Sequence, residues 1–247
     1  MHIKTTAQRE RGTMDGNETN SDDMMAAGKA CFRFWFDDAK RAEDKLAARH
    51  GAATVPVSIS YKGLEFSLRP ASAGVDDAQF IAVNPIDLPE GPSHELIFAG
   101  GEAGSFAALA MVMTTLAAEI AEAGAARAVM WVPSGTVTGA DFFVKLAKAW
   151  ADGGAFPAMV LVALKSDGNA GLTSRGLDLF CGQELMLDLA PMAMPEQAKV
   201  AIRMIDHLVA EGPVTENEIV EVDGFGSFEI GPRNSGKNIY LRRTPFA

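Results

Sequence analysis

Residues 31–69 read CFRFWFDDAKRAEDKLAARHGAATVPVSISYKGLEFSLR, an order of apolar and polar residues that predicts a strand, a helix and a hairpin. The apolar run Cys31–Phe36 is typical of a strand. Asp38–His50 follows as a helix that ends at Gly51, because glycine readily adopts the backbone conformation that terminates a helix. This stretch alone therefore predicts a protein that combines a sheet with helices.

The hairpin is predicted from two alternating segments and the dipeptide between them. Val55–Tyr61 and Leu64–Arg69 flank Lys62-Gly63, which suits a two-residue turn. Further along, His94–Ala99 has the pattern of another strand. Ser105–Gly124 is predicted as a helix, because its apolar residues recur on one face.

The second half of the chain continues the alternation of strands and helices. The apolar run Ala128–Val132 suits a strand buried on both faces. Thr138 and Asp141 are spaced as a capping box that would open a helix, and Pro195 suits the first turn of the last helix. Further strands are expected at Met159–Lys165, Glu184–Leu189, Glu218–Val222, Phe228–Ile230 and Asn238–Arg243.

The expected fold class is α+β, with mixed, mainly antiparallel sheets and helices on one face of each. Residues 31–247 are expected to form a single domain of two similar β-α-β-β-α halves, approximately 31–124 and 125–247. Residues 1–30 are polar and have no hydrophobic period, which predicts a disordered tail. A short helix is expected at Asp76–Val83.

Composition restricts the class of protein. The 247 residues are 48% hydrophobic and 22% charged, which excludes a collagen-like, coiled-coil or wholly disordered chain. The net charge is −10, but residues 31–230 carry −13 whereas residues 231–247 carry +4. A body this acidic repels phosphate backbones, so we expect no nucleic-acid partner for it.

The cysteines and the apolar segments bear on the compartment. Cys31 and Cys181 each flank an apolar run and are predicted to be buried, reduced thiols. No apolar signal segment is recognisable near the N-terminus, and Phe106–Ile120 is too short to span a bilayer. We therefore expect a soluble cytoplasmic protein without membrane contact.

Several motifs resemble known sites but are incomplete. The loop Gly100–Ser105 lies between a predicted strand and helix, yet Ala99 stands where a dinucleotide fingerprint needs its first glycine. Pro133 breaks the pattern of a nucleophile elbow around Ser134. No metal-ligand spacing occurs among His2, His50, His94 and His207. We therefore expect no metal and no cofactor, and a nucleotide at Gly100–Ser105 remains a third hypothesis.

The densest polar stretch in an otherwise apolar region runs from Thr173 to Glu184. Arg175 could hold a carboxylate or phosphate, and Glu184 could act as its partner or as a base. An internal Arg–Glu pair that orients a loop is the alternative. The candidate binding residues are therefore Thr173, Ser174, Arg175 and Glu184, and no catalytic residue is assigned.

The same stretch resembles the C-terminal signature of a bacterial family, the domain-of-unknown-function 4261 family. The relevant segments are GLTSRGLDLFCGQELMLDL at residues 171–189 and the helix MPEQAKVAIRMIDHLVAEGPV at residues 194–214. The matching positions are Thr173, Gly176, Leu177, Gly182 and Glu184. The resemblance extends over roughly residues 31–230 and implies a bacterial lineage. It implies no activity, because none is assigned to the family.

Two functional hypotheses follow from these features. The first is a non-catalytic cytoplasmic module that binds a protein partner or assists an assembly, since the acidic body could meet a basic partner. The alternative is a small-molecule enzyme that holds an anionic substrate with Arg175 and uses Glu184 as general acid or base.

Overall fold

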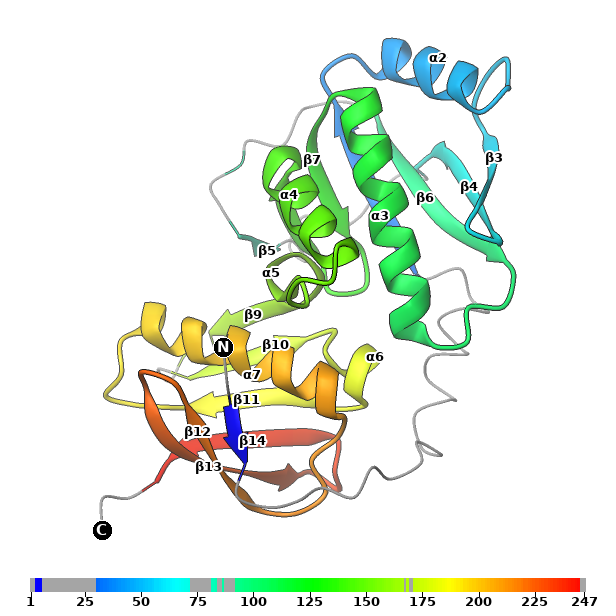
Figure 1. The fold of residues 1–247 in the computed structure, drawn as a ribbon. Coiled ribbons are helices and arrows are strands. Elements are labelled where there is room, and N and C mark those ends of the chain that lie inside the picture. Colours follow the sequence, from blue (N-terminus) through cyan, green and yellow to red (C-terminus); the bar gives the residue numbers. More distant parts are fainter. Residues whose placement is uncertain are drawn as a thin grey trace. The chain divides into compact units, whose positions relative to one another are not determined.

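The computed structural model describes residues 3–5, 30–71, 81–83, 86, 92–166, 168 and 171–244. By the contacts within the chain it divides into two compact units. We call Asn20–Leu161 the central unit, and Met1–Thr19 together with Val162–Ala247 the terminal unit. Each contains helices and a mostly antiparallel sheet, which confirms the α+β class (Figure 1).

The division into two units does not coincide with the expected halves of a single domain. It falls after Leu161 instead of near residue 124. The reason is that β7 (Ala126–Trp131) pairs with β2 (Cys31–Phe36), so residues on both sides of position 124 share one sheet. The pair of similar halves is therefore not confirmed.

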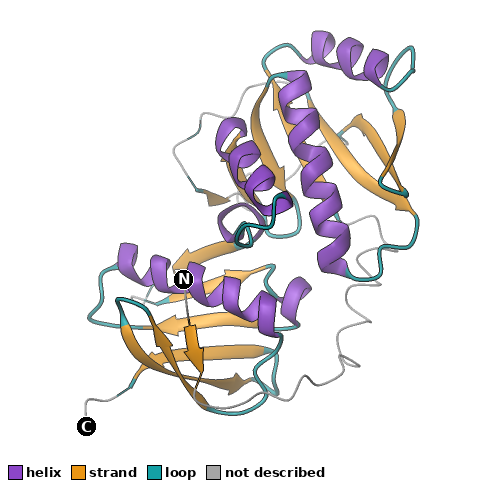
Figure 2. Ribbon diagram, in the orientation of Figure 1, coloured by secondary structure: helices purple, strands orange, loops and turns teal. Residues whose placement is uncertain are grey.

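The central unit is built on a sheet with the strand order β3-β4-β6-β2-β7-β8-β5. Its helices α3 and α4 cover one face, and α2 packs against α3 (Figures 1 and 2). The remaining strands are β3 (Val57–Tyr61), β4 (Leu64–Pro70), β5 (Ile81–Ala82), β6 (Ser93–Gly100) and β8 (Thr136–Gly139). The helices are α2 (Ala39–Arg49), α3 (Phe106–Gly124), α4 (Ala140–Ala151) and α5 (Ala158–Leu161).

The helix-covered face of this sheet holds an aromatic core. The ring of Phe32 lies 4.7 Å from that of Trp131 and 5.3 Å from that of Phe143, which α4 provides. α3 is long and apolar enough to cross a membrane by length and composition alone. More than half of its residues are buried within the protein, as in the core helix of a folded domain.

The opposite face of the same sheet carries a buried ion pair. Arg33 on β2 and Glu95 on β6 are register partners and form a salt bridge, with side chains only 8% and 9% exposed. Arg69 on β4 approaches the other oxygen of Glu95 at 3.7 Å. Burial, followed by the charge of Glu95, raises the pKa of Cys31 to about 12. Cys31 and Cys181 are both buried thiols outside any disulfide, as predicted.

The structure confirms several local predictions and corrects others. Cys31–Phe36 has the predicted bounds, and Lys62 and Gly63 both have positive φ, as the predicted two-residue turn requires. The capping box at Thr138 is wrong. Thr138 lies in β8, where its hydroxyl donates to the carbonyl of Val129, and α4 has no side-chain cap.

Two other segments differ from expectation. Met159–Lys165 is not one strand, because α5 occupies its first part and β9 (Ala163–Ser166) follows. Most of the helix expected at Asp76–Val83 lies outside the described residues. Its last part contains β5, which pairs in parallel with β8.

The terminal unit has a sheet with the order β1-β12-β13-β14-β11-β10-β9. All neighbours are antiparallel except β11 and β14. The strands are β1 (Ile3–Thr5), β9, β10 (Leu172–Arg175), β11 (Glu184–Asp188), β12 (Glu218–Val222), β13 (Gly226–Arg233) and β14 (Asn238–Arg243). The helices are α6 (Asp178–Cys181) and α7 (Met194–Glu211), and both lie on one side of the sheet (Figure 2).

α7 buries one face of this sheet, and among the described residues of the terminal unit no helix covers the other face. Pro195 lies in its first turn and Gly212 follows its last residue, as predicted. On the covered face, Phe228, Ile230 and Ile239 are fully buried. Because neighbouring residues of a strand point to opposite faces, the intervening residues form a second surface. We call this surface the open face: Met186, Asp188, Ile219, Glu221, Glu229, Tyr240 and Arg242.

The N-terminal segment is not wholly a tail. Ile3–Thr5 forms β1, which pairs antiparallel with β12. This corrects the expected disordered segment at residues 1–30 for these three residues, which gain order from backbone pairing with a distant strand. Residues 6–29 lie outside the described residues.

Candidate functional site

The predicted site residues lie where β10, α6 and β11 meet in the terminal unit. Two glycines with positive φ make this arrangement possible, Gly176 after β10 (φ +89°) and Gly182 after α6 (φ +78°). The amide of Gly182 donates to the carbonyl of Asp178 at 2.7 Å and ends α6. The chain therefore turns twice between Ser174 and Glu184 and brings these two side chains together.

The carboxylate of Glu184 binds the end of β10. It accepts a hydrogen bond from the hydroxyl of Ser174 and one from the amide of Gly176 at 2.5 Å. A longer bond of 3.4 Å comes from the amide of Leu177. Ser174 in turn accepts from the amide of Leu185 at 2.7 Å. Both carboxylate oxygens are thus used to join the strand ends, and we call Ser174, Gly176, Leu177 and Glu184 the Glu184 cluster.

Glu184 also has a perturbed pKa. Burial raises the pKa of Glu184 from its ordinary value of 4.5 to about 7. The hydrogen bonds from Ser174 and Gly176 oppose this rise, whereas the nearby carboxylate of Asp178 adds to it. Desolvation therefore outweighs the hydrogen bonds that favour the charged form.

The other two predicted residues have different positions. Arg175 is half-buried, and burial lowers its pKa while the charge of Glu184 partly offsets this effect. Thr173 lies opposite Met186 of β11 and Lys165 of β9. The structure therefore brings Ser174 and Glu184 into direct contact and places Arg175 within electrostatic reach of Glu184. It places Thr173 between β11 and the edge strand β9.

Gln183 is a residue that the sequence prediction missed. Its side chain is buried and bonds with backbone groups from two distant segments. The side-chain oxygen accepts from the amide of Val214 at 2.7 Å, and the nitrogen donates to the carbonyls of Val214 (2.9 Å) and Gly236 (2.7 Å). Its place directly before a predicted strand was the only available signal, and this signal did not identify the partners.

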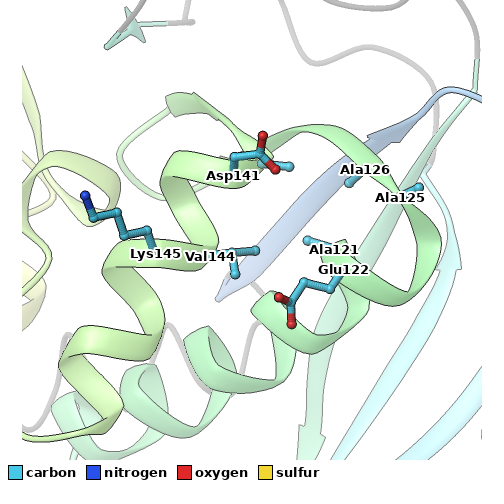
Figure 3. A pocket seen from close by; sticks show the side chains of 8 residues that line it. Ala121, Glu122, Ala125, Ala126, Asp141, Val144 and Lys145 are labelled. Carbon is cyan, nitrogen blue, oxygen red and sulfur yellow. The ribbon is translucent and has the colours of Figure 1, made fainter.

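The described cavities lie elsewhere, in the central unit. One of about 390 Å³ lies between the end of α3 and the start of α4 and is lined by Glu122, Asp141, Lys145 and mostly alanine side chains (Figure 3). A second of about 260 Å³ lies near the start of α2, where Asp38 caps the helix. Glu122 is already paired with Lys148 at 2.6 Å. Neither cavity is lined by a residue of the Glu184 cluster.

The incomplete motifs have structural roles. Ser105 caps α3 by accepting from the amide of Ala108, so Gly100–Ser105 is the turn that leads into this helix. Ser134 is buried and bonds with Thr136 at 2.7 Å. Buried His94 contacts Glu43 at 2.8 Å. Within the described ranges, no three His, Cys, Asp or Glu side chains are grouped as a metal site would require.

Comparison with known proteins adds no relatives. The chain matches no protein-family model, no curated protein and no solved structure. The resemblance of residues 171–189 to the domain-of-unknown-function 4261 family therefore stays a prediction.

Proposed function

We propose that this chain is a non-catalytic cytoplasmic module that binds a protein partner through the open face of the terminal unit. The observation that carries this proposal is the one-sided burial of the sheet. α7 covers one face, whereas the other presents an exposed Ile219 (37%) on β12 and a half-buried Tyr240 and Met186 on the neighbouring strands β14 and β11. Among the described residues the side chains of this face are exposed or half-buried, which makes them accessible to a partner.

The side chains of the open face suit a protein contact. Tyr240 lies opposite Met186 on the neighbouring strand, and the guanidinium of Arg233 lies 5.9 Å from the centre of the tyrosine ring. Tyrosine and arginine are enriched among the residues that dominate binding energy at protein interfaces, and methionine adapts to varied partners.

The polar groups of the open face are held in place by one another. Arg242 donates two hydrogen bonds to Glu229, at 3.0 and 2.7 Å, and the hydroxyl of Tyr240 donates to Asp188 at 3.2 Å. Paired side chains lose less conformational freedom when a partner binds, which favours association. The surface is therefore partly preorganised.

The Glu184 cluster supports a non-catalytic function. A general acid or base must reach the substrate within hydrogen-bond distance. The carboxylate of Glu184 instead accepts from Ser174, Gly176 and Leu177. Its contacts are those of a group that stabilises the junction between β10 and β11.

Affinity capture with matched variants tests this proposal. Ile219 on the open face and Met111 on α3 have the same exposed fraction, 37%. We expect Tyr240→Ala and Ile219→Ala to reduce the captured partner at least tenfold, at low and at moderate salt. Met111→Ala is the control and should capture as much as the unchanged chain. Absence of any saturable partner, or equal loss with Met111→Ala, contradicts the proposal.

One observation favours the alternative, an enzyme that acts on an anionic substrate at Arg175 and Glu184. A pKa of about 7 is suited to proton transfer at neutral pH. In that case Glu184→Gln and Arg175→Met should each abolish turnover of a carboxylate- or phosphate-bearing substrate while the fold is retained. Unchanged turnover in Glu184→Gln rules out this alternative.

A further inference from the structure

β1 is an added strand at the edge of the terminal sheet. It is one of the two edge strands in the order β1-β12-β13-β14-β11-β10-β9. Its described pairing comprises three residue pairs with β12. The next described residue after Thr5 is Ala30. Every other strand of the sheet comes from residues 163–243. The other pairings of this sheet therefore do not depend on β1.

The register between β1 and β12 indicates which residue types suit a segment that pairs with the edge of β12. Ile3 lies opposite Val222, Lys4 opposite Glu221 and Thr5 opposite Val220. Val220 and Val222 are fully buried, whereas Glu221 is exposed on the other face. Opposite residues on antiparallel strands share a face, and oppositely charged cross-strand pairs are favourable. The edge thus suits an extended segment in which a basic residue stands between two β-branched residues.

We propose that the edge of β12 is a strand-addition site for an extended peptide of a partner protein, and that β1 occupies this site in the resting chain. The peptide has a basic residue opposite Glu221 and β-branched residues opposite Val220 and Val222. This inference rests on the proposed function and adds a second contact surface to it. Recognition by strand addition uses backbone hydrogen bonds for affinity and the alternate side chains for specificity.

Because only three described residue pairs join β1 to β12, another extended segment can replace β1 at this edge. A backbone hydrogen bond contributes little net free energy to stability, and ordering the strand opposes this gain. A partner segment that pairs with more of Glu218–Val222 than β1 does can therefore displace it.

Binding of a labelled peptide to the full chain tests the inference. The probe is MHIKTTAQ, residues 1–8, measured by fluorescence anisotropy. The variant is Ile3→Pro/Thr5→Pro, because proline lacks the amide donor that strand pairing needs. We expect this variant to bind the probe at least tenfold more tightly than the unchanged chain, with the same melting temperature. Equal affinity of both chains, or no binding by the folded variant, overturns the proposal.

Charge reversal provides the specificity control. A probe with Lys4→Glu should bind the double-proline variant several-fold more weakly, and Glu221→Lys in that variant should restore it. Lys4→Glu in the full chain is a milder second variant and should itself increase binding of the original probe. Probe binding that does not change with either charge reversal contradicts the assigned register.

The oligomeric state of the unchanged chain tests who occupies the site. A dimer that the proline substitutions abolish would show that a second copy of this chain is the occupant, and would overturn the inferred partner.

The outcomes separate this inference from the proposed function. Tyr240→Ala lies on the open face and should leave probe binding unchanged. Loss of probe binding with partner capture intact overturns the strand-addition site alone. Loss of partner capture with probe binding intact overturns the open-face proposal alone.

Discussion

Strand β2 of the central sheet and strand β12 of the terminal sheet are buried in different ways. In the central unit all six residues of β2 are buried, so its central strand is covered on both faces. In the terminal unit β12 alternates between buried and exposed residues. The first pattern leaves its strand no surface for a partner, whereas the second leaves one complete face. The difference indicates why we assign recognition to the terminal unit.

The same contrast applies to the ion pairs of the two sheets. Arg33 and Glu95 form a cross-strand pair with side chains 8% and 9% exposed. Arg242 and Glu229 form the corresponding pair on the open face, with 48% and 24% exposed. Identical side-chain chemistry should therefore have different energetic consequences, since removing one partner of a buried pair leaves an uncompensated charge.

The largest expected effect is on the buried pair. Glu95→Ala should destabilise the central unit by about 3–5 kcal/mol, because Arg33 then lies buried without its carboxylate. The measurement is denaturant unfolding followed by tryptophan fluorescence. This signal reports the central unit alone, since the three tryptophans, Trp35, Trp131 and Trp150, all belong to it.

Two variants check the cause of that loss. Glu229→Ala, on the open face, should change the stability of the terminal unit by at most about 1 kcal/mol, as exposed pairs do. Arg33→Met/Glu95→Leu should recover most of the loss, because it removes both charges at once. A smaller loss of stability in Glu95→Ala than in Glu229→Ala would contradict the expected difference between the buried and the exposed ion pair.

The next effect concerns Gln183, which stabilises the covered side of the terminal unit. Gln183→Leu should destabilise this unit by about 2–3 kcal/mol, because it leaves polar backbone groups of Val214 and Gly236 without their side-chain partner. Hydrogen exchange of the β11 and β14 amides measures the loss. Leucine is similar in size to glutamine but makes no hydrogen bonds, so unchanged exchange would show that these bonds contribute nothing to stability.

Local patterns predicted those parts of the fold that local interactions determine. Cys31–Phe36 and Asn238–Arg243 have the predicted bounds, and the Lys62-Gly63 turn needs only its own two backbone conformations. β1 was missed because three residues form a strand only through backbone pairing with distant β12. Thr138 was misassigned because pairing with β7 outweighs its preference for a helix cap.

The sequence predicts only that part of the candidate site that depends on residues close together in the chain. Ser174 and Glu184 are close in the sequence and form one polar stretch, so their proximity was foreseeable. The hydrogen bonds that Glu184 accepts from the backbone amides of Gly176 and Leu177 could not be foreseen. They form only because the chain makes two turns with positive φ. The partners of Gln183 lie 31 and 53 residues away, at distances that no periodic pattern specifies.

The Glu184 cluster should make the stability of the terminal unit depend on pH. The folded-state pKa of about 7 lies above the ordinary 4.5, so the folded unit holds a proton that the unfolded chain has released. Stability should therefore fall as pH rises from about 4.5 to about 7, by on the order of 3 kcal/mol, and remain level above that range.

Glu184→Gln should remove most of this pH dependence, because the amide does not titrate. Glu229→Gln is the matched control on the open face and should keep it. The measurement is urea unfolding of the terminal unit, followed by hydrogen exchange at several pH values. A slope of the opposite sign, with stability rising between pH 5 and 7 and Glu184→Gln reducing that rise, would show that the hydrogen bonds to the carboxylate outweigh its burial.

The smallest expected effect on stability is at Tyr240, and this position distinguishes the two faces of a single strand most directly. Tyr240→Ala should change the stability of the terminal unit by less than about 1 kcal/mol, as substitutions at surface positions do. Its neighbour Ile239 is fully buried, and Ile239→Ala should cost about 2–5 kcal/mol. Substitution of Ile239 would then reduce stability, whereas substitution of the adjacent Tyr240 would reduce partner capture. If Tyr240→Ala destabilises the unit as much as Ile239→Ala, Tyr240 belongs to the core and the open face is not a binding surface.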